Sequence, residues 1–432
     1  MIRQLLKNKV LKNAGWLVIG QVIQMFISLV VGILTARYLG PSNYGLINYA
    51  GAYTAFFASV CTLGINSVIV KEFVDHVGQE GKIIGTALGM RTLSSFLSML
   101  SIIGISFVID ADEPTTRIVV LLCSLGMIFN VFETFNYWFQ SRLQSKKTAI
   151  ASLIAYTITA IYKVILLCTN KSVIYFAMAT SVDYLCVAIV LYCFYLKEKG
   201  SKLSFSWTYG RKLLQKSCHF ILPGIMVAIY GQTDKIMLKH MISDSEIGYY
   251  STACAICSMW CFVLNAIIDS ITPPIMQAYN ENKGKYYYLN RLLYCVVFYI
   301  SAFVSMFFTI FGKVIITILY GNTYIPSVAP LRIVTWYTAF SFLGVARNAW
   351  VVCENKQKYL KYIYIAAAVS NVILNIVFIP RLGAVGAAYA SLIAQIITVI
   401  VVPFFIKDMR PNAKLMLEAI FLKDMFGEKR VK

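Results

Sequence analysis

This 432-residue sequence contains few charged residues. Asp, Glu, Lys and Arg together make up 13% of it, against about a quarter in soluble proteins, whereas 59% is hydrophobic. This composition excludes a soluble globular enzyme and a disordered protein. A helix that spans a bilayer needs about 20 mostly apolar residues, so the chain has room for about a dozen of them joined by short loops.

Motifs for nucleotide and zinc chemistry are absent as well. No G-x-x-x-x-G-K-[ST] phosphate loop occurs, and Gly78-Gln-Glu-Gly81-Lys82 has the wrong spacing for one. No H-E-x-x-H motif occurs, the three histidines are scattered, and no loop is long enough for a soluble catalytic domain. We therefore expect no enzyme and no bound cofactor, and an ATP-driven pump only if a partner supplies the ATPase.

The excess of basic residues does not indicate a nucleic-acid-binding protein. The net charge is +20, but Lys and Arg come in short groups between long apolar runs and form no continuous basic face. Contact with the anionic lipids of a membrane explains such groups better. We expect membrane lipids, and no nucleic acid, among the partners.

The apolar runs predict an all-α integral membrane protein, because a backbone in lipid must satisfy its own hydrogen bonds. No cleavable signal peptide is expected, since the first run is too long and lacks a small-residue cleavage site. The twelve predicted spans are Ala14–Ala36, Gly45–Val70, Ile83–Ile109, Ile118–Tyr137, Ala149–Cys168, Val173–Tyr195, His219–Met241, Ile247–Ile275, Leu292–Leu319, Ile333–Cys353, Tyr362–Ile379 and Gly383–Ile406.

The basic residues also predict the orientation of these helices. Most Lys and Arg lie before the first span and in every second segment after it, including the long loop with Lys197, Lys199 and Lys202. The intervening segments hold few. Because positive charge marks the cytoplasmic side, both termini are predicted to be cytoplasmic.

The two halves of the chain echo each other. Ser42 and Gly45 follow the first span as Ser245 and Gly248 follow the seventh, and Trp138 and Trp350 each have a lysine eight residues on. Six spans per half give both halves the same orientation, so the repeat is parallel, with its axis along the membrane normal. The predicted parts are an N-terminal six-helix bundle at 1–196, a cytoplasmic linker at 197–216, a C-terminal six-helix bundle at 217–406 and a tail at 407–432.

Transporters with such repeats bind substrate between the halves and rock around it, which favours a transporter over a channel or a membrane-embedded enzyme. Pro223-Gly224 in the seventh span predicts a hinge, because proline removes a backbone hydrogen bond. Leu417, Ile420 and Phe421 among the charges of the tail fit an interfacial amphipathic segment, and a frayed cytosolic tail equally well.

The 11 cysteines lie mostly inside apolar runs and predict no disulfide framework. Cys254, Cys257 and Cys261 would share one face of a helix, a pattern that metal or redox chemistry uses. Small apolar packing is the favoured interpretation, because no companion ligand is evident.

Four stretches carry a family resemblance: residues 36–50 at the start of the second span, Tyr137-Trp-Phe-Gln140, Thr233-Asp-Lys-Ile-Met-Leu238, and residues 371–390 at the junction of the last two spans. They resemble polysaccharide flippases of the Wzx type, which move O-antigen or capsule repeat units. The patterns are shared in part with multidrug exporters and lipid II flippases of the same multidrug/oligosaccharidyl-lipid/polysaccharide exporter superfamily. The count of twelve spans favours the Wzx branch over lipid II flippases.

The resemblance implies a MATE-like fold with two six-helix bundles arranged as a V. It implies a flippase that moves undecaprenyl-diphosphate-linked oligosaccharide from the cytoplasmic to the outer leaflet of the bacterial cytoplasmic membrane, for surface polysaccharide biosynthesis. The lipid tail would stay in the bilayer while the sugar crosses through the protein. A polysaccharide polymerase is the protein partner that the resemblance implies.

Several charged residues lie within predicted spans, where each costs about 2.5–3.5 kcal/mol on insertion scales. A diphosphate that leaves water needs fixed donors, and Arg offers bidentate geometry while Lys offers a compact charge. Internal ion pairs are the alternative, as is snorkelling for Lys163, Arg347 and Glu133. The candidate substrate-binding residues are Arg91, Lys235, Arg347, Asp269 and Asp183.

Asp234 is the candidate for ion coupling, because a buried carboxylate can load a proton or a sodium ion and release it after a conformational change. Lipid II flippases, which the chain resembles, carry a sodium site among helices 7, 11 and 12, and the similar positions here are Asp234, Asn371 and Asn375. The eleventh span has no second acid, so a proton is an equal alternative. Asn371 and Asn375 would otherwise simply bond neighbouring helices.

Two rival functions remain on the sequence alone. A cation-coupled multidrug exporter of the same superfamily would favour an acidic, aromatic cavity, whereas Arg91 and Lys235 favour an anionic ligand. A membrane glycosyltransferase or polymerase would need a sizeable outer loop, and the predicted outer loops are short.

Overall fold

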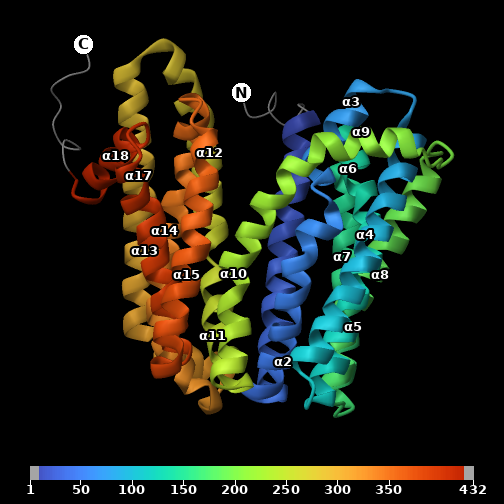
Figure 1. Cartoon of the computed structure of the whole chain (residues 1–432), viewed down its shortest axis with the longest axis horizontal. Helices are drawn as coiled ribbons and strands as arrows, with labels where there is room; N and C mark the ends of the chain where they lie inside the picture. The colour runs from blue at the N-terminus through green and yellow to red at the C-terminus, as the bar shows by residue number, and fades with distance from the viewer. Residues whose placement is uncertain (1–8, 423–432) are drawn as a thin grey trace. The chain divides into compact units, whose positions relative to one another are not determined.

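The computed structural model describes residues 9–422, and these are almost entirely helical, with no strand among them. The chain divides into two compact units, Met1–Ala228 and Ile229–Lys432, and the boundary falls inside helix α10 (Ile221–Met241). Figure 1 labels the helices of both units.

The first unit is built on a long N-terminal helix. α2 packs against α7, α5 packs against α8, and α7 packs against α8. Its elements are α2 (Lys9–Thr62), η1 (Ile65–Ser67), α3 (Ile69–Asp75), α4 (Glu80–Ile109), α5 (Pro114–Asn130), η2 (Val131–Glu133), α6 (Thr134–Ser141), α7 (Ser145–Cys168), α8 (Val173–Lys197), α9 (Trp207–Ser217) and η3 (Cys218–Phe220).

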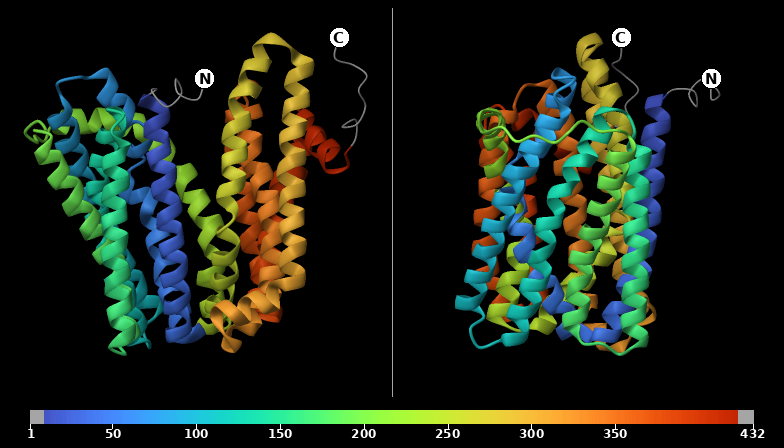
Figure 2. Two further views of the ribbon diagram at one scale, coloured as in Figure 1. Left: turned by 180° about the vertical axis from the view of Figure 1, so that it is seen from behind. Right: turned by 90° about the vertical axis from the view of Figure 1, so that its right-hand side faces the viewer.

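The second unit contains most of α10 and all later helices. α13 packs against α14, α15 against α16, and α14 against α16. The elements are α11 (Asp244–Ser258), α12 (Cys261–Glu281), α13 (Lys283–Tyr320), η4 (Asn322–Ser327), α14 (Val328–Cys353), η5 (Gln357–Tyr359), α15 (Leu360–Leu382), α16 (Ala384–Ile396), η6 (Ile397–Val401), α17 (Val402–Phe405) and α18 (Arg410–Ile420). Figure 2 shows both units from two further directions.

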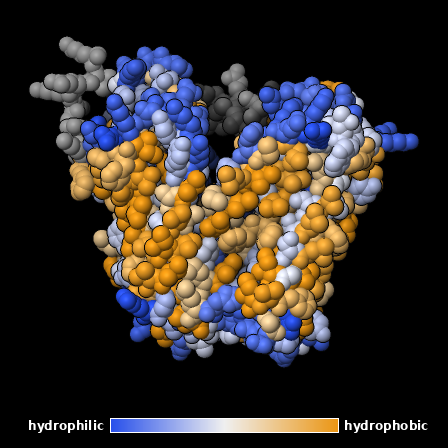
Figure 3. Space-filling model, viewed as in Figure 1, coloured by the Kyte–Doolittle hydropathy of each residue, from blue (hydrophilic) through white to orange (hydrophobic). Residues whose placement is uncertain are grey.

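Eleven helical segments in the described part of the chain are long and apolar enough to cross a membrane. The first of them holds two of the predicted spans, because Gly40 (φ 70°, ψ 172°) interrupts α2 just before Pro41. With α2 divided there and α10 assigned to the second unit, each unit has six passes. Figure 3 shows a broad hydrophobic belt on each unit, with hydrophilic residues at both ends.

The predicted repeat is visible in the helix breaks. Gly40 ends the first half of α2, and Ser243, its counterpart after the seventh span, is extended and precedes α11. The second pairing holds as well. Trp138 and Trp350 are both buried near helix ends, and each is followed five residues later by a residue with positive φ, Leu143 (56°) and Asn355 (54°). Corresponding turns therefore follow corresponding helices in the two units.

The eighth predicted span is not one continuous helix. α11 ends at Ser258 and α12 begins at Cys261, so the break falls at Met259 and Trp260. Across this break Cys261 Sγ still donates to the Cys257 carbonyl at 3.2 Å, so the two cysteines stay close to each other. Among the described residues no group of His, Cys, Asp and Glu is placed to hold a metal ion.

A strap of residues 199–206 connects α8 to α9 and lies along α4. Gly81, Gly85 and Gly89 stand one helical turn apart on α4, beneath this strap. A Cβ atom on Gly85 would lie 2.5 Å from the carbonyl oxygen of Ser204, where no real Cβ fits. Gly81 and Gly85 therefore form a groove that admits the strap backbone, and Gly89 extends it to admit the Phe205 ring. The Ser204 amide donates to the Gly81 carbonyl at 3.2 Å within this groove.

Helix α9 is held beside the strap by a buried carboxylate. Glu72 of α3 accepts hydrogen bonds from Lys216 Nζ and Tyr209 Oη, both at 2.6 Å. Ser217 Oγ then donates to the Leu63 carbonyl at 2.8 Å. The predicted linker, residues 197–216, thus packs against the first unit along its whole length.

The tail carries a docked helix. α18 lies against α13, where Arg291 pairs with Glu418 at 2.7 Å and Asn412 Nδ2 donates to Tyr294 Oη at 2.7 Å. Met416 is fully buried in this contact. Residues 410–420 are therefore not frayed, and the remaining predicted tail beyond 422 lies outside the described residues.

Candidate functional site

Asp234 is the centre of a buried hydrogen-bond network in the second unit. Its Oδ1 accepts from Asn371 Nδ2 at 3.1 Å and from Asn375 Nδ2 at 2.6 Å. Its Oδ2 accepts from Tyr250 Oη at 2.5 Å and from Ser391 Oγ at 2.6 Å. These donors come from α11, α15 and α16, so one carboxylate on α10 ties four helices together.

The network combines the three residues predicted for ion coupling. Asp234 is 3% exposed, and Asn371 and Asn375 are fully buried. Asn371 and Asn375 also bond each other, from Nδ2 of Asn375 to Oδ1 of Asn371 at 3.1 Å. Four donors satisfy an ionised carboxylate, which explains how a negative charge is tolerated at this depth.

The same network offers oxygen atoms to a hard cation. Asn375 Oδ1 is buried and has no hydrogen-bond partner in the described structure. Rotation of the two amides would turn Oδ1 of Asn371 and Asn375 toward Asp234, beside the hydroxyls of Ser391 and Tyr250. Carboxylate, amide and hydroxyl oxygens together are the ligand type that hard cations prefer.

Lys235 is next to Asp234 in sequence but not part of its network. Its Nζ donates to Gln232 Oε1 at 3.1 Å, one turn back on α10. Tyr230, also on α10, instead donates to Gln395 of α16. Adjacent residues on a helix point about 100° apart, and α10 accordingly offers different polar groups on different faces.

Arg347 lies in the second unit against an irregular turn. It is 4% exposed, and its Nη1 donates to the Thr398 carbonyl at 3.2 Å. Thr398 belongs to η6, a π-helical turn, and such turns shift the ordinary backbone hydrogen-bond pattern. The Nε of Arg347 is buried without a partner in the described residues.

Arg91 is likewise buried, on α4 of the first unit. It is 1% exposed, and its guanidinium donates to Thr134 Oγ1 at 2.9 Å and to Asn130 Oδ1 at 3.1 Å. These neutral acceptors lie where α5 ends and α6 begins, so Arg91 fastens α4 to that junction. Its Nε also has no partner among the described atoms. In this conformation Arg91 and Arg347 are enclosed by their own units.

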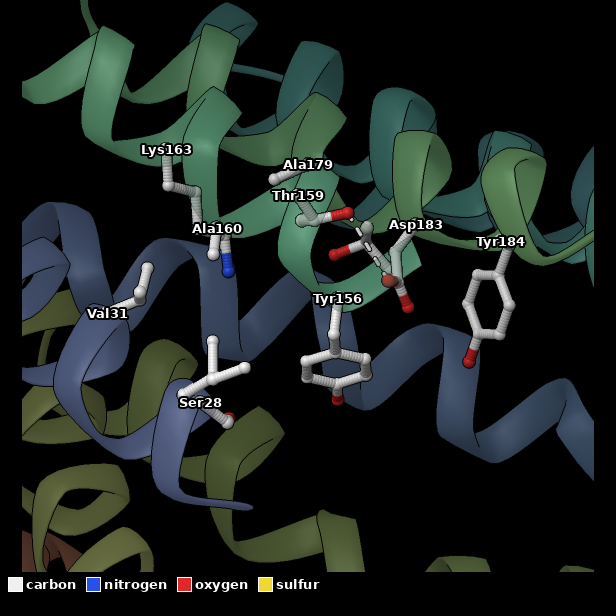
Figure 4. A pocket seen from close by; sticks show the side chains of 11 residues that line it. Ser28, Val31, Tyr156, Thr159, Ala160, Lys163, Ala179, Asp183 and Tyr184 are labelled. Atoms are coloured by element: carbon white, nitrogen blue, oxygen red, sulfur yellow. Dashed lines mark hydrogen bonds between the residues drawn. The ribbon is translucent and has the colours of Figure 1, made fainter. Parts of the chain in front are cut away.

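Asp183 lies in a cavity of the first unit together with Lys163. The cavity has a volume of about 210 Å³ and lies between α2, α7 and α8. Thr159 Oγ1 donates to Asp183 Oδ1 at 3.3 Å, as Figure 4 shows. The lining residues are Ile27, Ser28, Val31, Tyr156, Thr159, Ala160, Lys163, Ala179, Thr180, Asp183 and Tyr184.

Asp269 is exposed on the surface of the second unit. It lies on α12, where Asn265 and Gln277 are exposed at four-residue and eight-residue spacings from it and therefore share its face. The structure thus does not bring the five predicted substrate-binding residues into one site within either unit. Their role in binding stays a prediction.

Sequence reasoning did not identify Tyr250 and Ser391 as partners of Asp234. They lie 16 and 157 residues further along the chain, and no motif or spacing marks them. Tyr156, Thr159 and Tyr184 of the cavity were missed for the same reason. The pairing of α7 with α8 brings Tyr156 and Thr159 beside Asp183, whereas Tyr184 is its neighbour on α8.

Comparison with known proteins gives a consistent family. Residues 10–279 match the model of the family described as polysaccharide biosynthesis protein. The capsular polysaccharide biosynthesis protein CapF of Staphylococcus aureus is 20% identical, over 92% of this chain and 99% of that protein. The Lsg locus putative protein 1 of Haemophilus influenzae is 23% identical, over 64% of this chain and 68% of that protein.

Solved structures of similar fold are transporters. An inward-facing multidrug resistance MATE family transporter of the MOP superfamily matches with a TM-score of 0.69 at 14% identity, over 94% of this chain and 99% of that one. The lipid II flippase MurJ in an inward closed conformation matches with a TM-score of 0.66 at 17% identity, over 94% of this chain and 90% of that one. The predicted MATE-like fold of a multi-pass membrane protein is thereby confirmed.

Proposed function

The chain belongs to the polysaccharide biosynthesis protein family, and from that membership we propose that it is a flippase for lipid-linked oligosaccharides. Its substrate would be an undecaprenyl-diphosphate-linked repeat unit, moved from the cytoplasmic to the outer leaflet of the bacterial cytoplasmic membrane. Two observations together support the proposal: the sequence matches this family, and the fold is similar to those of a MATE transporter and MurJ. The distribution of Lys and Arg supports a cytoplasmic location for both termini.

The chemistry of the substrate makes such a fold useful. An undecaprenyl tail is soluble in the bilayer, whereas a diphosphate and its sugars are not, because polar and charged groups are costly to remove from water. Only the polar head therefore needs a path through the protein. The exposed hydrophobic side chains on α13, such as Phe303 at 73% and Ile310 at 63%, provide a lipid-facing surface along which a tail can remain in the membrane. In the outer leaflet, a polysaccharide polymerase would consume the product.

The energy for directional transport is proposed to come from an ion bound at Asp234. The carboxylate is buried and shared by four helices, so loading or unloading it changes the contacts that hold these helices together. A proton would convert one acceptor oxygen into a donor, and the hydroxyls of Tyr250 and Ser391 can reverse to accept from it. A sodium ion would instead require the Asn371 and Asn375 amides to rotate.

The first experiment deletes the gene for this protein from its host. We expect surface polysaccharide to be lost and undecaprenyl-linked oligosaccharide to accumulate on the cytoplasmic leaflet. Persistent surface polysaccharide with an unchanged lipid-linked pool would count against the flippase, and drug efflux would then be measured for a multidrug exporter. Restoring the wild-type chain is the control.

The second experiment tests the coupling ion in proteoliposomes. Lipid-linked oligosaccharide extracted from the deletion strain is added, and its translocation is followed under an imposed sodium gradient or an imposed pH gradient. We expect one of the two gradients to drive transport and Asp234→Asn to abolish that response. Glu281→Gln, at an exposed carboxylate on α12, is the matched control. Transport by Asp234→Asn at the wild-type rate under both gradients would remove Asp234 from the mechanism.

A further inference from the structure

The cavity around Lys163 and Asp183 is unusual for a membrane helix bundle, because most of its polar groups lie at bilayer depth. Lys163 is five residues, or about 8 Å, from the end of α7, and Asp183 is ten residues, or about 15 Å, from the start of α8. Lys163 lines the cavity, whereas the snorkelling alternative would place its ammonium at the membrane surface. Figure 4 shows its side chain at the cavity with Tyr156 and Asp183.

The charged groups of this cavity do not satisfy each other's hydrogen-bonding capacity. Among the described residues, Asp183 has one hydrogen bond, from Thr159 at 3.3 Å, and Lys163 has neither a hydrogen bond nor an ion pair within 4.0 Å. A Lys ammonium offers three donors and a carboxylate about four acceptor positions. An ionisable residue inside a membrane protein marks a ligand or ion path when it lines a cavity in this way.

The charge of the lining selects the kind of ligand. One Lys and one Asp give a net charge near zero, so a diphosphate would be repelled by Asp183 and an organic cation by Lys163. The hydroxyls of Ser28, Thr159 and Thr180 add groups that both donate and accept. This mixture suits a neutral molecule that presents many hydroxyl groups of its own.

The shape of the cavity limits the size of that molecule. Its volume, about 210 Å³, lies below the roughly 300–1,000 Å³ of drug-sized sites, so it has room for one sugar ring but not for an oligosaccharide. Tyr156 and Tyr184 add aromatic rings to the lining, and each also carries a hydroxyl. Rigid aromatic surface beside a few placed polar groups is the usual composition of a small-molecule site.

We propose that this cavity is a subsite for a single neutral sugar ring of the transported oligosaccharide. The inference rests on the proposed flippase function and adds a sugar-reading element in the first unit, separate from Asp234 in the second. Asp183 accepts hydrogen bonds from ring hydroxyls, Lys163 donates to ring or hydroxyl oxygens, and Tyr184 contributes its ring and hydroxyl.

The test compares two lipid probes on the purified full-length chain in lipid nanodiscs. One probe is the lipid-linked oligosaccharide extracted from cells that lack the chain, and the other is undecaprenyl diphosphate without sugar. Dissociation constants are measured for the wild type, for Asp183→Asn and for Tyr184→Phe. The matched control is Thr157→Ala on α7, because Thr157 is exposed, bonds only the Leu153 carbonyl of its own helix and does not line the cavity.

We expect Asp183→Asn to weaken binding of the sugar-bearing probe by about tenfold or more, since a hydrogen bond to a charged group is lost, and to leave undecaprenyl diphosphate unaffected. Tyr184→Phe removes one hydroxyl and keeps the ring, so it should act in the same direction and more weakly, which keeps the test usable if Asp183→Asn folds poorly. The Thr157→Ala chain should bind both probes as the wild type does.

Three results would overturn the subsite. Equal weakening for both probes would assign the residues to the diphosphate or to folding, and unchanged binding in both variants would remove the sugar contact. A pH dependence of binding that disappears in Asp183→Asn for both probes would reassign the cavity to a proton. If the wild type binds neither probe, the proposed flippase function fails as well, whereas tight wild-type binding with indifferent variants refutes the subsite alone.

Discussion

Replacing Gly85 by alanine should release the strap from α4. The added Cβ atom would lie 2.5 Å from the Ser204 carbonyl oxygen and 2.7 Å from its amide nitrogen, so the strap must move by about 1 Å to reach ordinary contact. That movement strains the hydrogen bond from the Ser204 amide to Gly81. Overpacking of this kind costs about 1–3 kcal/mol, more than the roughly 0.5–1 kcal/mol that alanine gains over glycine within a helix.

The assay is limited trypsin digestion of the purified chain. Lys199 and Lys202 are exposed in the strap, but cleavage requires the local backbone to open. Each 1.4 kcal/mol lost from docking raises the open population about tenfold, so we expect cleavage within the strap to be faster by about that factor.

Gly104→Ala is the matched control for this substitution. Gly104 lies on the same helix, and a Cβ atom there would meet nothing within 4 Å. Alanine at Gly104 should therefore leave strap cleavage unchanged and slightly stabilise α4. Equal cleavage rates for the two variants, or faster cleavage of Gly85→Ala at sites outside the strap, would refute the account of the glycine groove.

Two further predictions concern elements that pack at the ends of the units. Burial raises the pKa of Glu72, but hydrogen bonds from Lys216 and Tyr209 outweigh it and the pKa lies below its usual value. The stabilisation by Glu72 is therefore complete above the unfolded pKa of about 4.3 and is lost as the pH falls from there through the folded value. Glu72→Gln should flatten the dependence of the melting temperature on pH below about pH 5, and an unchanged slope there would contradict this. Met416→Asp should detach α18, because it places a charge where the side chain is fully buried. The rate of hydrogen exchange in residues 410–420 should then rise. Lys414→Asp, at an exposed position of the same helix, should leave that rate unchanged.

Much of the fold could be predicted because the hydrophobic runs have the length that a bilayer demands. All-helical structure, the parallel repeat and the family resemblance are confirmed. Gly40-Pro41 belongs to the family pattern at residues 36–50. In the structure it interrupts α2 between the first and the second predicted span. The break at Met259 and Trp260 escaped prediction, because no glycine or proline marks it.

The strap also escaped prediction, for a different reason. Gly81, Gly85 and Gly89 follow the spacing that in membrane helices usually indicates another helix packed closely alongside. Here the partner is an extended segment more than a hundred residues further on. A spacing of small residues predicts a close approach but not what approaches.

The candidate site was predictable in its charged members and not in their partners. A carboxylate such as Asp234 within a span is a recognisable candidate, because a charge in the bilayer costs free energy and needs a functional reason. Asn371 and Asn375 were identified through the resemblance. Tyr250 and Ser391 are ordinary residues in apolar helices until the fold places them at Asp234. The same holds for Arg91 and Arg347, whose neutral acceptors, Thr134 and the Thr398 carbonyl, leave no trace in a charge pattern.

The docked strap has a practical consequence for anyone who tags or splits this chain. Residues 197–216 form the longest predicted loop and would be the first choice for inserting an epitope or a fluorescent protein. Because the strap backbone fills a glycine groove and α9 is bonded to Glu72, an insertion there would displace packed structure. The turn between α12 and α13 is the better place, since residues 281–285 are all exposed and a Cβ atom on Gly284 would approach only the side chain of Asn282.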